Sequence, residues 1–239
     1  MHKLLAPLAS LILVGCSPEP ALQRGQSLFS DPTFSPADTN VFSCATCHVT
    51  TKDPDPARRL PGYTMFDAAH RPAWWNLKFD YLLDAVNECY VEFMRGPRLA
   101  TDSTDGRALL VYLDSLAPDA HADALTFTFV ENLDAAYYAK LVGLNGDAGR
   151  GAVLYKQGCA NCHGDVGTGN GRLGPKVTVI PTETITQHGT IDPVAGARPV
   201  SVEKVRHGKY LGAGGNMAFY ATELLSDQEL ADILIYMKL

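Results

Sequence analysis

The motif Cys-x-x-Cys-His occurs twice in this chain, as CATCH from Cys44 and as CANCH from Cys159. In each copy two thiols lie one helical turn apart, and an imidazole follows the second thiol directly. Three chemistries use closely spaced cysteines: zinc sites, thioredoxin-like dithiols, and haem attached through two thioethers. The choice among them depends on the compartment in which the chain works, and the start of the sequence indicates that compartment.

The first residues have the composition of a secretory signal. A basic start, MHK, is followed by the apolar run LLAPLASLILVG, which ends before Cys16 and is too short to span a bilayer as a mature helix. The tetrapeptide LVGC resembles the bacterial lipobox, in which the cysteine is lipidated; the alternative is an ordinary signal peptide cut nearby. We therefore expect a signal peptide over 1–15 and a lipid-anchored tether over 16–23 at a membrane surface.

Ser17 follows this cysteine, where an acidic residue would resemble an inner-membrane retention signal. The expected location is the bacterial cell envelope, as a periplasm-facing lipoprotein in the outer rather than the inner membrane. The 239 residues carry a mild net charge of −6, without the basic stripe of a nucleic-acid binder. An exported protein pairs its cysteines or uses them to hold cofactors.

The six cysteines are best explained by haem. Cys16 is assigned to lipid, four cysteines lie in the two motifs, and Cys89 is left alone. In a zinc site each His would have to turn back from directly beside its own cysteine, and a dithiol pair leaves the adjoining His unexplained. We predict two covalent haem c groups with two kinds of protein ligand: thioether bonds from Cys44, Cys47, Cys159 and Cys162, and proximal iron ligands His48 and His163.

Both motifs lie in a similar sequence frame. RGQSLF precedes the first and RGAVLY the second, and each motif is followed by a turn-rich loop that reaches a proline, Pro61 or Pro175. Each half ends in an amphipathic stretch, STDGRALLVYLDSL or SDQELADILIYMKL, with a serine as helix N-cap. The run GTGNG follows the second motif rather than a strand, so we interpret it as backbone passing close to haem, not as a nucleotide loop.

With this layout the chain resembles class I cytochrome c domains in tandem. The resemblance implies an all-α fold of two small domains, 24–118 and 146–239, each wrapped around one haem. A linker over 119–145 joins them; its run LTFTFV alternates like a short strand and is expected to pack one domain on the other. The resemblance also implies that the carbonyls of Pro61 and Pro175 accept the imidazole N–H of the proximal histidines.

Met217 is the predicted distal ligand of the second haem, because it lies shortly before the closing helix in a glycine-rich approach. Thioether ligation stabilises ferrous iron and raises the potential. The alternatives are His207, His188, and a Met217 that only fills the core.

The distal ligand of the first haem is open between Cys89 and Met94, with His70 or no ligand as further alternatives. Cys89 shares a helical face with Leu82 and Val86. Met94 comes five positions later, about 140° further round a helix. One continuous helix therefore cannot present both residues to the same iron.

The pattern VNEC ending at Cys89, followed by Gly96 and Leu99, resembles the N-terminal haem domain of diheme thiosulfate dehydrogenases and, more loosely, sulfur-oxidising cytochromes. The resemblance implies a distal Cys89 thiolate, which stabilises ferric iron and lowers the potential. Arg95 and Arg98 lie just beyond, where guanidinium groups could hold a sulfur oxyanion such as thiosulfate. The alternative is that both arginines belong to a solvated loop.

The sequence thus predicts a membrane-anchored diheme cytochrome c that passes electrons between periplasmic or membrane redox proteins. Trp74 and Trp75 are expected to shield the first haem or the seam between the domains. One alternative is an enzyme that oxidises thiosulfate or reduces tetrathionate at the N-terminal haem. The other is a gas sensor whose iron has a weak or absent sixth ligand.

Overall fold

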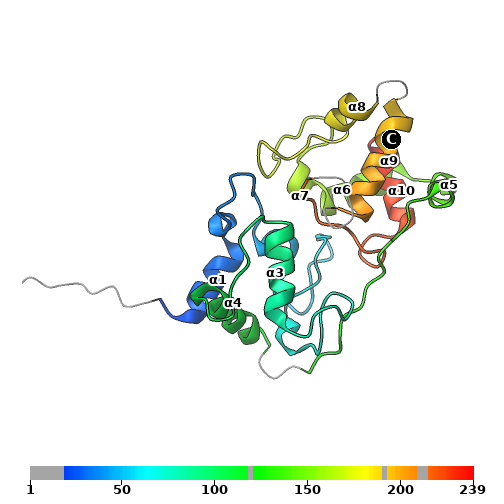
Figure 1. The fold of residues 1–239 in the computed structure, drawn as a ribbon. Helices are drawn as coiled ribbons and strands as arrows, with labels where there is room; N and C mark the ends of the chain where they lie inside the picture. Colours follow the sequence, from blue (N-terminus) through cyan, green and yellow to red (C-terminus); the bar gives the residue numbers. More distant parts are fainter. Residues whose placement is uncertain (1–18, 118–120, 190–192, 209–214) are drawn as a thin grey trace, which may run out of the picture.

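The computed structural model of the chain describes residues 19–117, 121–189, 193–208 and 215–239. The predicted signal peptide and the lipidation residue Cys16 lie outside these ranges. The regular secondary structure is helical and forms two groups that follow one another along the chain (Figure 1). No helix within the described ranges is long and apolar enough to span a bilayer.

The N-terminal group combines four α-helices with two short 3₁₀ turns. They are α1 (Ala21–Ser30), η1 (Pro32–Phe34), α2 (Cys44–Cys47), η2 (Ala68–His70), α3 (Leu82–Glu92) and α4 (Thr104–Ser115). The C-terminal group consists of α5 (Ala135–Gly143), α6 (Ala148–Gly158), α7 (Ala160–His163), α8 (Thr182–His188), α9 (Pro193–Arg206) and α10 (Asp227–Tyr236).

The two closing helices begin where their N-cap residues predict. Ser103 accepts a hydrogen bond from the Gly106 N–H at the start of α4. At the start of α10, Ser226 and Glu229 form a reciprocal capping box, so two backbone donors that would otherwise lack helical partners are satisfied. Both predicted closing helices are confirmed.

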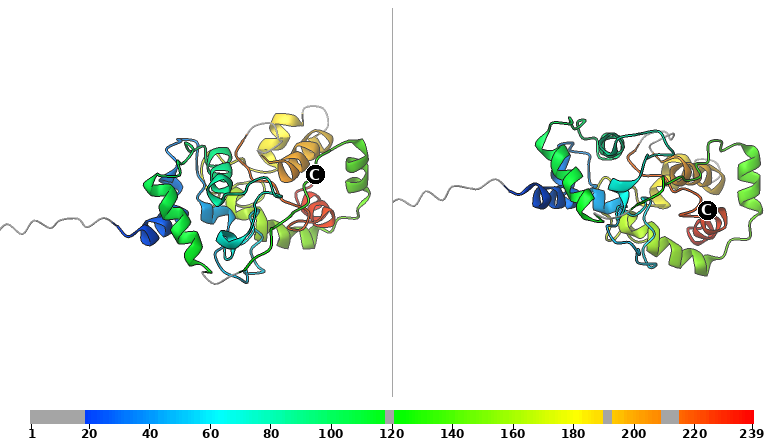
Figure 2. Two further views of the ribbon diagram at one scale, coloured as in Figure 1. Left: turned by 60° about the horizontal axis from the view of Figure 1, so that its bottom comes forward. Right: turned by 90° about the horizontal axis from the view of Figure 1, so that it is seen from below.

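In each half the helix that precedes the Cys-x-x-Cys-His motif crosses the closing helix at a glycine. α1 packs against α4, as both views of Figure 2 show, and α6 packs against α10. A Cβ on Gly25 would overlap the carbonyl of Ala108, and a Cβ on Gly151 would overlap the carbonyl of Asp232. The crossings therefore bring backbone against backbone, which any residue larger than glycine would prevent.

An aromatic pair beside each crossing repeats the same geometry. The rings of Phe29 and Tyr112 have centroids 5.5 Å apart and planes tilted by 59°. The rings of Tyr155 and Tyr236 have centroids 5.7 Å apart and planes tilted by 57°. Phe29 and Tyr155 each follow their crossing glycine by one helical turn. The two halves are thus structural repeats of one helical frame.

The N-terminal half has a small core of its own. Its cluster of buried apolar residues is Phe29, Leu109 and Leu113, and partly buried residues including Cys44 pack against it. Other buried apolar side chains of this half, among them Tyr90, Phe93 and Met94, lie around the cavity described below and not in this cluster.

The linker run LTFTFV was predicted as a short strand, and this is wrong. Residues 121–134 carry no regular secondary structure, because no neighbouring strand pairs with them. The Thr128 N–H instead donates to the carboxylate of Glu223, and its carbonyl accepts from the Thr222 N–H. The Asn76 side chain bonds both the N–H and the carbonyl of Phe127. The linker therefore contacts both halves, as expected.

Replacing either crossing glycine by alanine should destabilise the half that contains it. Gly151→Ala forces α6 away from the α10 backbone, which cannot yield like a flexible side chain, and should lower the free energy of unfolding by about 1–3 kcal/mol. Equilibrium denaturation of the holoprotein, followed by circular dichroism, measures this.

Gly143→Ala in α5 is the matched control. No atom lies within 4 Å of a Cβ placed there, so this change should be neutral or stabilise by up to about 1 kcal/mol. Equal stability of Gly151→Ala and the wild type would show that the crossing does not require glycine.

Candidate functional site

The first Cys-x-x-Cys-His motif lies on the wall of a largely apolar cavity. The empty space within it, part of which is open solvent, amounts to about 1340 Å³. Cys44, Cys47 and His48 all line it. The one-turn helix α2 that carries the two thiols is held at its start by a capping box between Ser43 and Thr46.

The second motif lines a second and larger cavity. It encloses about 2210 Å³, again including open solvent. Cys159, Cys162 and His163 contribute to its wall from the end of α6 and from α7, and Met217 contributes from the loop before α10. The two motifs are therefore placed in the same way, each beside a cavity of its own half.

Each motif histidine is fixed by a backbone carbonyl fifteen residues further along the chain. Nδ1 of His48 lies 2.8 Å from the Tyr63 carbonyl oxygen, and Nδ1 of His163 lies 2.8 Å from the Thr178 carbonyl oxygen. Because a carbonyl only accepts, Nδ1 carries the proton and Nε2 keeps its lone pair. Burial lowers the pKa of both histidines, which favours the neutral imidazole that binds iron.

The predicted acceptors Pro61 and Pro175 are therefore wrong. Pro61 lines the first cavity, but the carbonyl that meets the His48 imidazole belongs to Tyr63, two residues later. Gly62 packs so closely on the His48 ring that a Cβ there would overlap it. In the second half the acceptor, Thr178, lies three residues beyond the proline.

The run GTGNG has a different role from the one predicted. Gly167, Gly169 and Gly171 all have positive φ values, and Asp165 N–H donates to the Asn170 carbonyl across the turn. None of these residues lines the second cavity. The glycines are needed for left-handed turn geometry, not for an approach to haem.

Thiols of the motifs fit covalent haem attachment. The motif cysteines form no disulfide. Burial raises the pKa of Cys44 to about 11 and that of Cys47 and Cys159 to about 12, so these thiols are protonated at neutral pH. Reduced cysteines followed by an imidazole, on an apolar wall, are the residues that covalent haem attachment requires.

Two polar groups at the first cavity also fit haem. The hydroxyl of Tyr63 is buried and has no hydrogen-bond partner. Arg71, which is 9% exposed, lines the same cavity and donates to the Thr64 carbonyl and to Asp67. A hydroxyl donor and a guanidinium suit the carboxylate groups on the edge of a haem. The residues present therefore fit the group.

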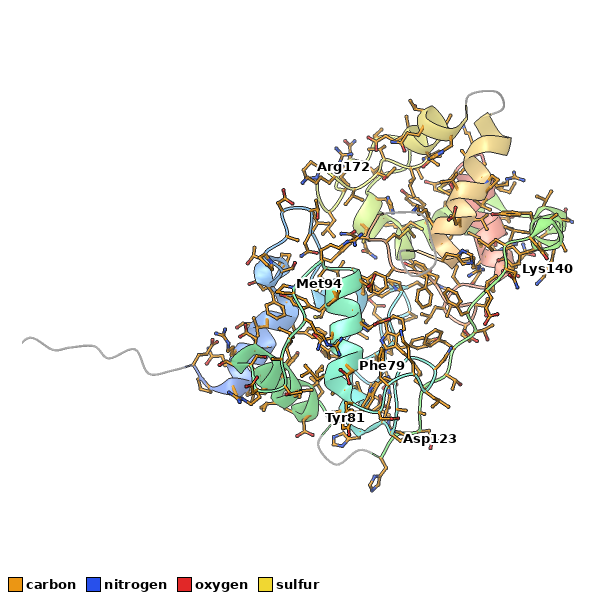
Figure 3. The ribbon with its side chains drawn as sticks, viewed as in Figure 1. Phe79, Tyr81, Met94, Asp123, Lys140 and Arg172 are labelled. Carbon is orange, nitrogen blue, oxygen red and sulfur yellow. The ribbon has the colours of Figure 1, made fainter. Side chains whose placement is uncertain are left out.

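Cys89 and Met94 line the same cavity, which corrects the expectation that only one of them can. The helix α3 ends at Glu92, so Met94 lies in the turn beyond it and not on a further face of a continuous helix. Figure 3 shows Met94 at the end of α3 that faces the C-terminal helices. The structure therefore brings both predicted sulfur ligands, Cys89 and Met94, to one site, and Met65 lines it as well.

Burial raises the pKa of the Cys89 thiol, and the nearby Cys44 and Cys47 raise it further, so Cys89 faces the motif. Asn87, one of the residues that carry the sequence resemblance, is 1% exposed. Its side chain bonds the N–H and the carbonyl of Leu99, which ties the following loop back onto α3. His70 does not line the cavity; its Nε2 lies 3.6 Å from Asp114 on α4.

Among the candidates for the second distal ligand, His207 is turned away. Its Nε2 lies 2.8 Å from the Val130 carbonyl, and its ring stacks on Phe129. His188 lines the cavity from the exposed end of α8. Met217 lines the cavity and packs partly buried against the C-terminal core. The geometry favours Met217.

Arg95 and Arg98 were expected at the first cavity, and neither is there. Arg98 is exposed and pairs with Asp84 on α3. Arg95 has a left-handed φ of 60°, which directs its side chain to the C-terminal half, where it lines the second cavity. The guanidinium at the first cavity is that of Arg71.

The two cavities share one wall. Five residues line both of them: Phe42, Cys47, Pro61, Phe93 and Ala218. After burial, the largest cause of the raised pKa of Cys47 is charge on Cys162, a thiol of the other motif. The two motifs therefore lie close together across this shared wall.

Tyr220 lies between the two motifs. Its hydroxyl is 3.3 Å from the Gly158 carbonyl and 3.2 Å from the Arg59 carbonyl, one from each half. Trp75 forms a second bridge, because its ring contacts both Phe93 and Phe219. The prediction that this tryptophan shields the seam agrees with these contacts. Trp74 donates from Nε1 to the Ala68 carbonyl and lines the first cavity.

Sequence reasoning missed Tyr63, Thr178 and Tyr220. The equal spacing of fifteen residues from each motif histidine to its acceptor could have indicated the first two. No residue-type signal marks Tyr220, because only the packing of the two halves brings it between the motifs.

Over the described residues, helices that carry two Cys-x-x-Cys-His motifs beside apolar cavities are the features typical of c-type cytochromes. Residues 146–237 match the family model described as cytochrome c oxidase, cbb3-type, subunit III. No curated protein sequence matches the chain significantly.

One similar solved structure is the thiosulfate dehydrogenase TsdBA from Marichromatium purpuratum in its "as isolated" form. The identity is 22% and the TM-score 0.43, and the alignment covers 93% of this chain and 47% of that one. The chain thus spans about half the length of the solved chain. At this level the likeness carries no functional argument.

Proposed function

We propose that the chain binds two covalent haem c groups and passes electrons between periplasmic or membrane redox proteins of the cell envelope. Bound haem supplies one-electron exchange between ferric and ferrous iron. The observation that carries the proposal is Cys47, which lines both cavities and so places the two motifs close together.

The protein contributes orientation and a dry environment. His48 and His163 each have Nδ1 fixed by a carbonyl, so Nε2 is held ready for iron. The aromatic residues at the seam cover the space between the cavities. Met217, as thioether ligand of the second iron, would favour the ferrous state.

Cys89 is the distal ligand that we propose for the first iron. Cys89 lines the same cavity as Cys44, Cys47 and His48, which supports this proposal. A thiolate favours ferric iron, which would separate the potentials of the two haems. Met94, which lines the same cavity, is the alternative ligand.

A second candidate function is thiosulfate oxidation or tetrathionate reduction at the first haem. The observation in its favour is the Cys89 thiol in the first cavity. Because Arg95 and Arg98 lie elsewhere, Arg71 is the guanidinium that would meet a sulfur oxyanion there, and it is already paired with Asp67. Electron transfer therefore remains the primary proposal. Two available sulfur ligands also disfavour a gas sensor with an open iron.

The haem content tests the central proposal. We expect two covalent haems per chain in a pyridine haemochrome assay, because both motifs are complete. The paired change of Cys44 and Cys47 to alanine should leave one haem, and so should the paired change of Cys159 and Cys162. One haem per chain in the wild type, or zinc in its place, would contradict the proposal.

Exchanging the sulfur ligands tests the first distal site. With Cys89 as ligand, a redox titration should show two well-separated steps, and the low-potential haem should give a thiolate signature in electron paramagnetic resonance. Cys89→Met should merge the steps toward high potential and abolish any thiosulfate oxidation, while the spectrum of the second haem stays unchanged.

Met94→Ala is the matched change on the same wall, and it should cause only a packing loss of about 2–5 kcal/mol. If Met94→Ala removes the sixth ligand while Cys89→Ala leaves the spectrum intact, Met94 is the ligand. In that case the sulfur-enzyme candidate fails and the electron carrier remains.

The membrane anchor is a separate proposal that rests on the LVGC sequence ending at Cys16. A fatty-acid analogue supplied to growing cells should label the wild type. Cys16→Ser should be unlabelled, and should remain as unprocessed precursor or become soluble. An unlabelled wild type would show that LVGC is only the end of an ordinary signal peptide.

A further inference from the structure

Arg95 lies just after helix α3 of the N-terminal half, and it contacts the residues that precede Met217 in the C-terminal half. Its Nε donates to the Asn216 Oδ1 at 2.8 Å, and its Nη2 donates to the Gly215 carbonyl at 3.2 Å. These acceptors are the two residues directly before Met217. Arg95 and Gly215 are 120 positions apart in the sequence, and the contact joins the end of α3 at the first cavity to the Met217 segment at the second cavity.

The backbone at Arg95 is unusual for an arginine. Its φ of 60° is left-handed, a conformation in which helices usually end with glycine. The next residue is a glycine, yet it is Gly96 that packs against the Tyr90 ring, and its N–H returns to the Tyr90 carbonyl. A side chain is thus retained at a position where glycine would be less strained, and this side chain makes the contact across the seam.

The two ligand loops line each other's cavities. Met94 lines the first cavity while the adjacent Arg95 lines the second. Met217 lines the second while Phe219, two residues later, lines the first. The backbone of Met94 is held in place, because its carbonyl accepts a buried hydrogen bond of 2.6 Å from Ser35 Oγ. Arg95 thus follows an anchored residue and bonds the two residues that precede Met217.

We propose that Arg95 is a positioning residue for Met217: it orients the distal ligand of the second haem from the other half of the molecule. The inference rests on the proposed role of Met217 as that ligand. A guanidinium suits the task because two of its N–H groups reach a side-chain and a backbone acceptor at once, which fixes both the place and the direction of the loop.

The first step of the experiment isolates the ligand from its positioning. The ferric wild type should show the red charge-transfer band of a methionine-ligated haem, and Met217→Ala should remove it. If the wild type lacks the band, or keeps it in Met217→Ala, the proposed ligand is wrong, and the positioning role falls with it.

The second step removes Arg95. Arg95→Gly relieves the left-handed backbone but deletes both hydrogen bonds, and because these effects oppose each other the stability of the protein should change little. The charge-transfer band should nevertheless weaken, the potential of the second haem should fall, and carbon monoxide should bind its ferrous form about fivefold faster or more, the lower end of typical coupling between sites. A purely structural role predicts the reverse pattern, with the stability changed and the second haem unchanged.

Matched variants complete the test. Arg98→Gly, three residues away and paired only with Asp84, should leave the second haem as it is. Asn216→Leu should reproduce the effect of Arg95→Gly, and the double variant should add little to either. Asn216→Asp keeps an acceptor for the guanidinium and should retain the band. An intact band and unchanged carbon monoxide binding in Arg95→Gly would overturn the proposal even where Met217 is confirmed as the ligand.

Discussion

Each half of the molecule depends on a glycine that allows two helices to cross at backbone contact. Gly25 meets the Ala108 carbonyl and Gly151 meets the Asp232 carbonyl, at distances that exclude even a methyl group. This crossing closes one side of each half and sets the neighbouring aromatic pair. On the other side of the N-terminal half, the apolar side chains surround a cavity. Under the proposed function, a covalent macrocycle would supply the apolar contacts there.

The motif histidines are the second fixed point, and they rely on the main chain and not on particular side chains. Two loops of different sequence each return a carbonyl to Nδ1 after fifteen residues. A backbone acceptor leaves the identity of the loop residues free, so the loops can differ while the imidazoles stay in one orientation. Those differences then build the shared wall, where Pro61 of one loop lines both cavities.

Sequence patterns predicted the features that depend on residue type and local spacing: the two motifs, the serine-capped closing helices and the all-helical class. They wrongly predicted Pro61 and Pro175 as the acceptors of the imidazole N–H. Every residue has a backbone carbonyl, so the sequence does not show which carbonyl meets the histidine. The expectation that Cys89 and Met94 cannot reach the same iron is wrong because α3 ends at Glu92. Met94 lies beyond the helix, directly before the turn of Arg95 and Gly96. The run LTFTFV has the alternation of a strand, but pairing requires a neighbouring strand that the fold does not provide.

The shared frame makes the differences between the two cavities informative. The first offers sulfur from Cys89 or Met94, and its one lining guanidinium, Arg71, is already paired with Asp67. The second offers Met217, and Lys176 and Lys204 also line its wall. With Cys89 as thiolate and Met217 as thioether, the second haem would have the higher potential. Under the proposed ligand sets, an electron that enters at the first haem would therefore be drawn across the shared wall to the second.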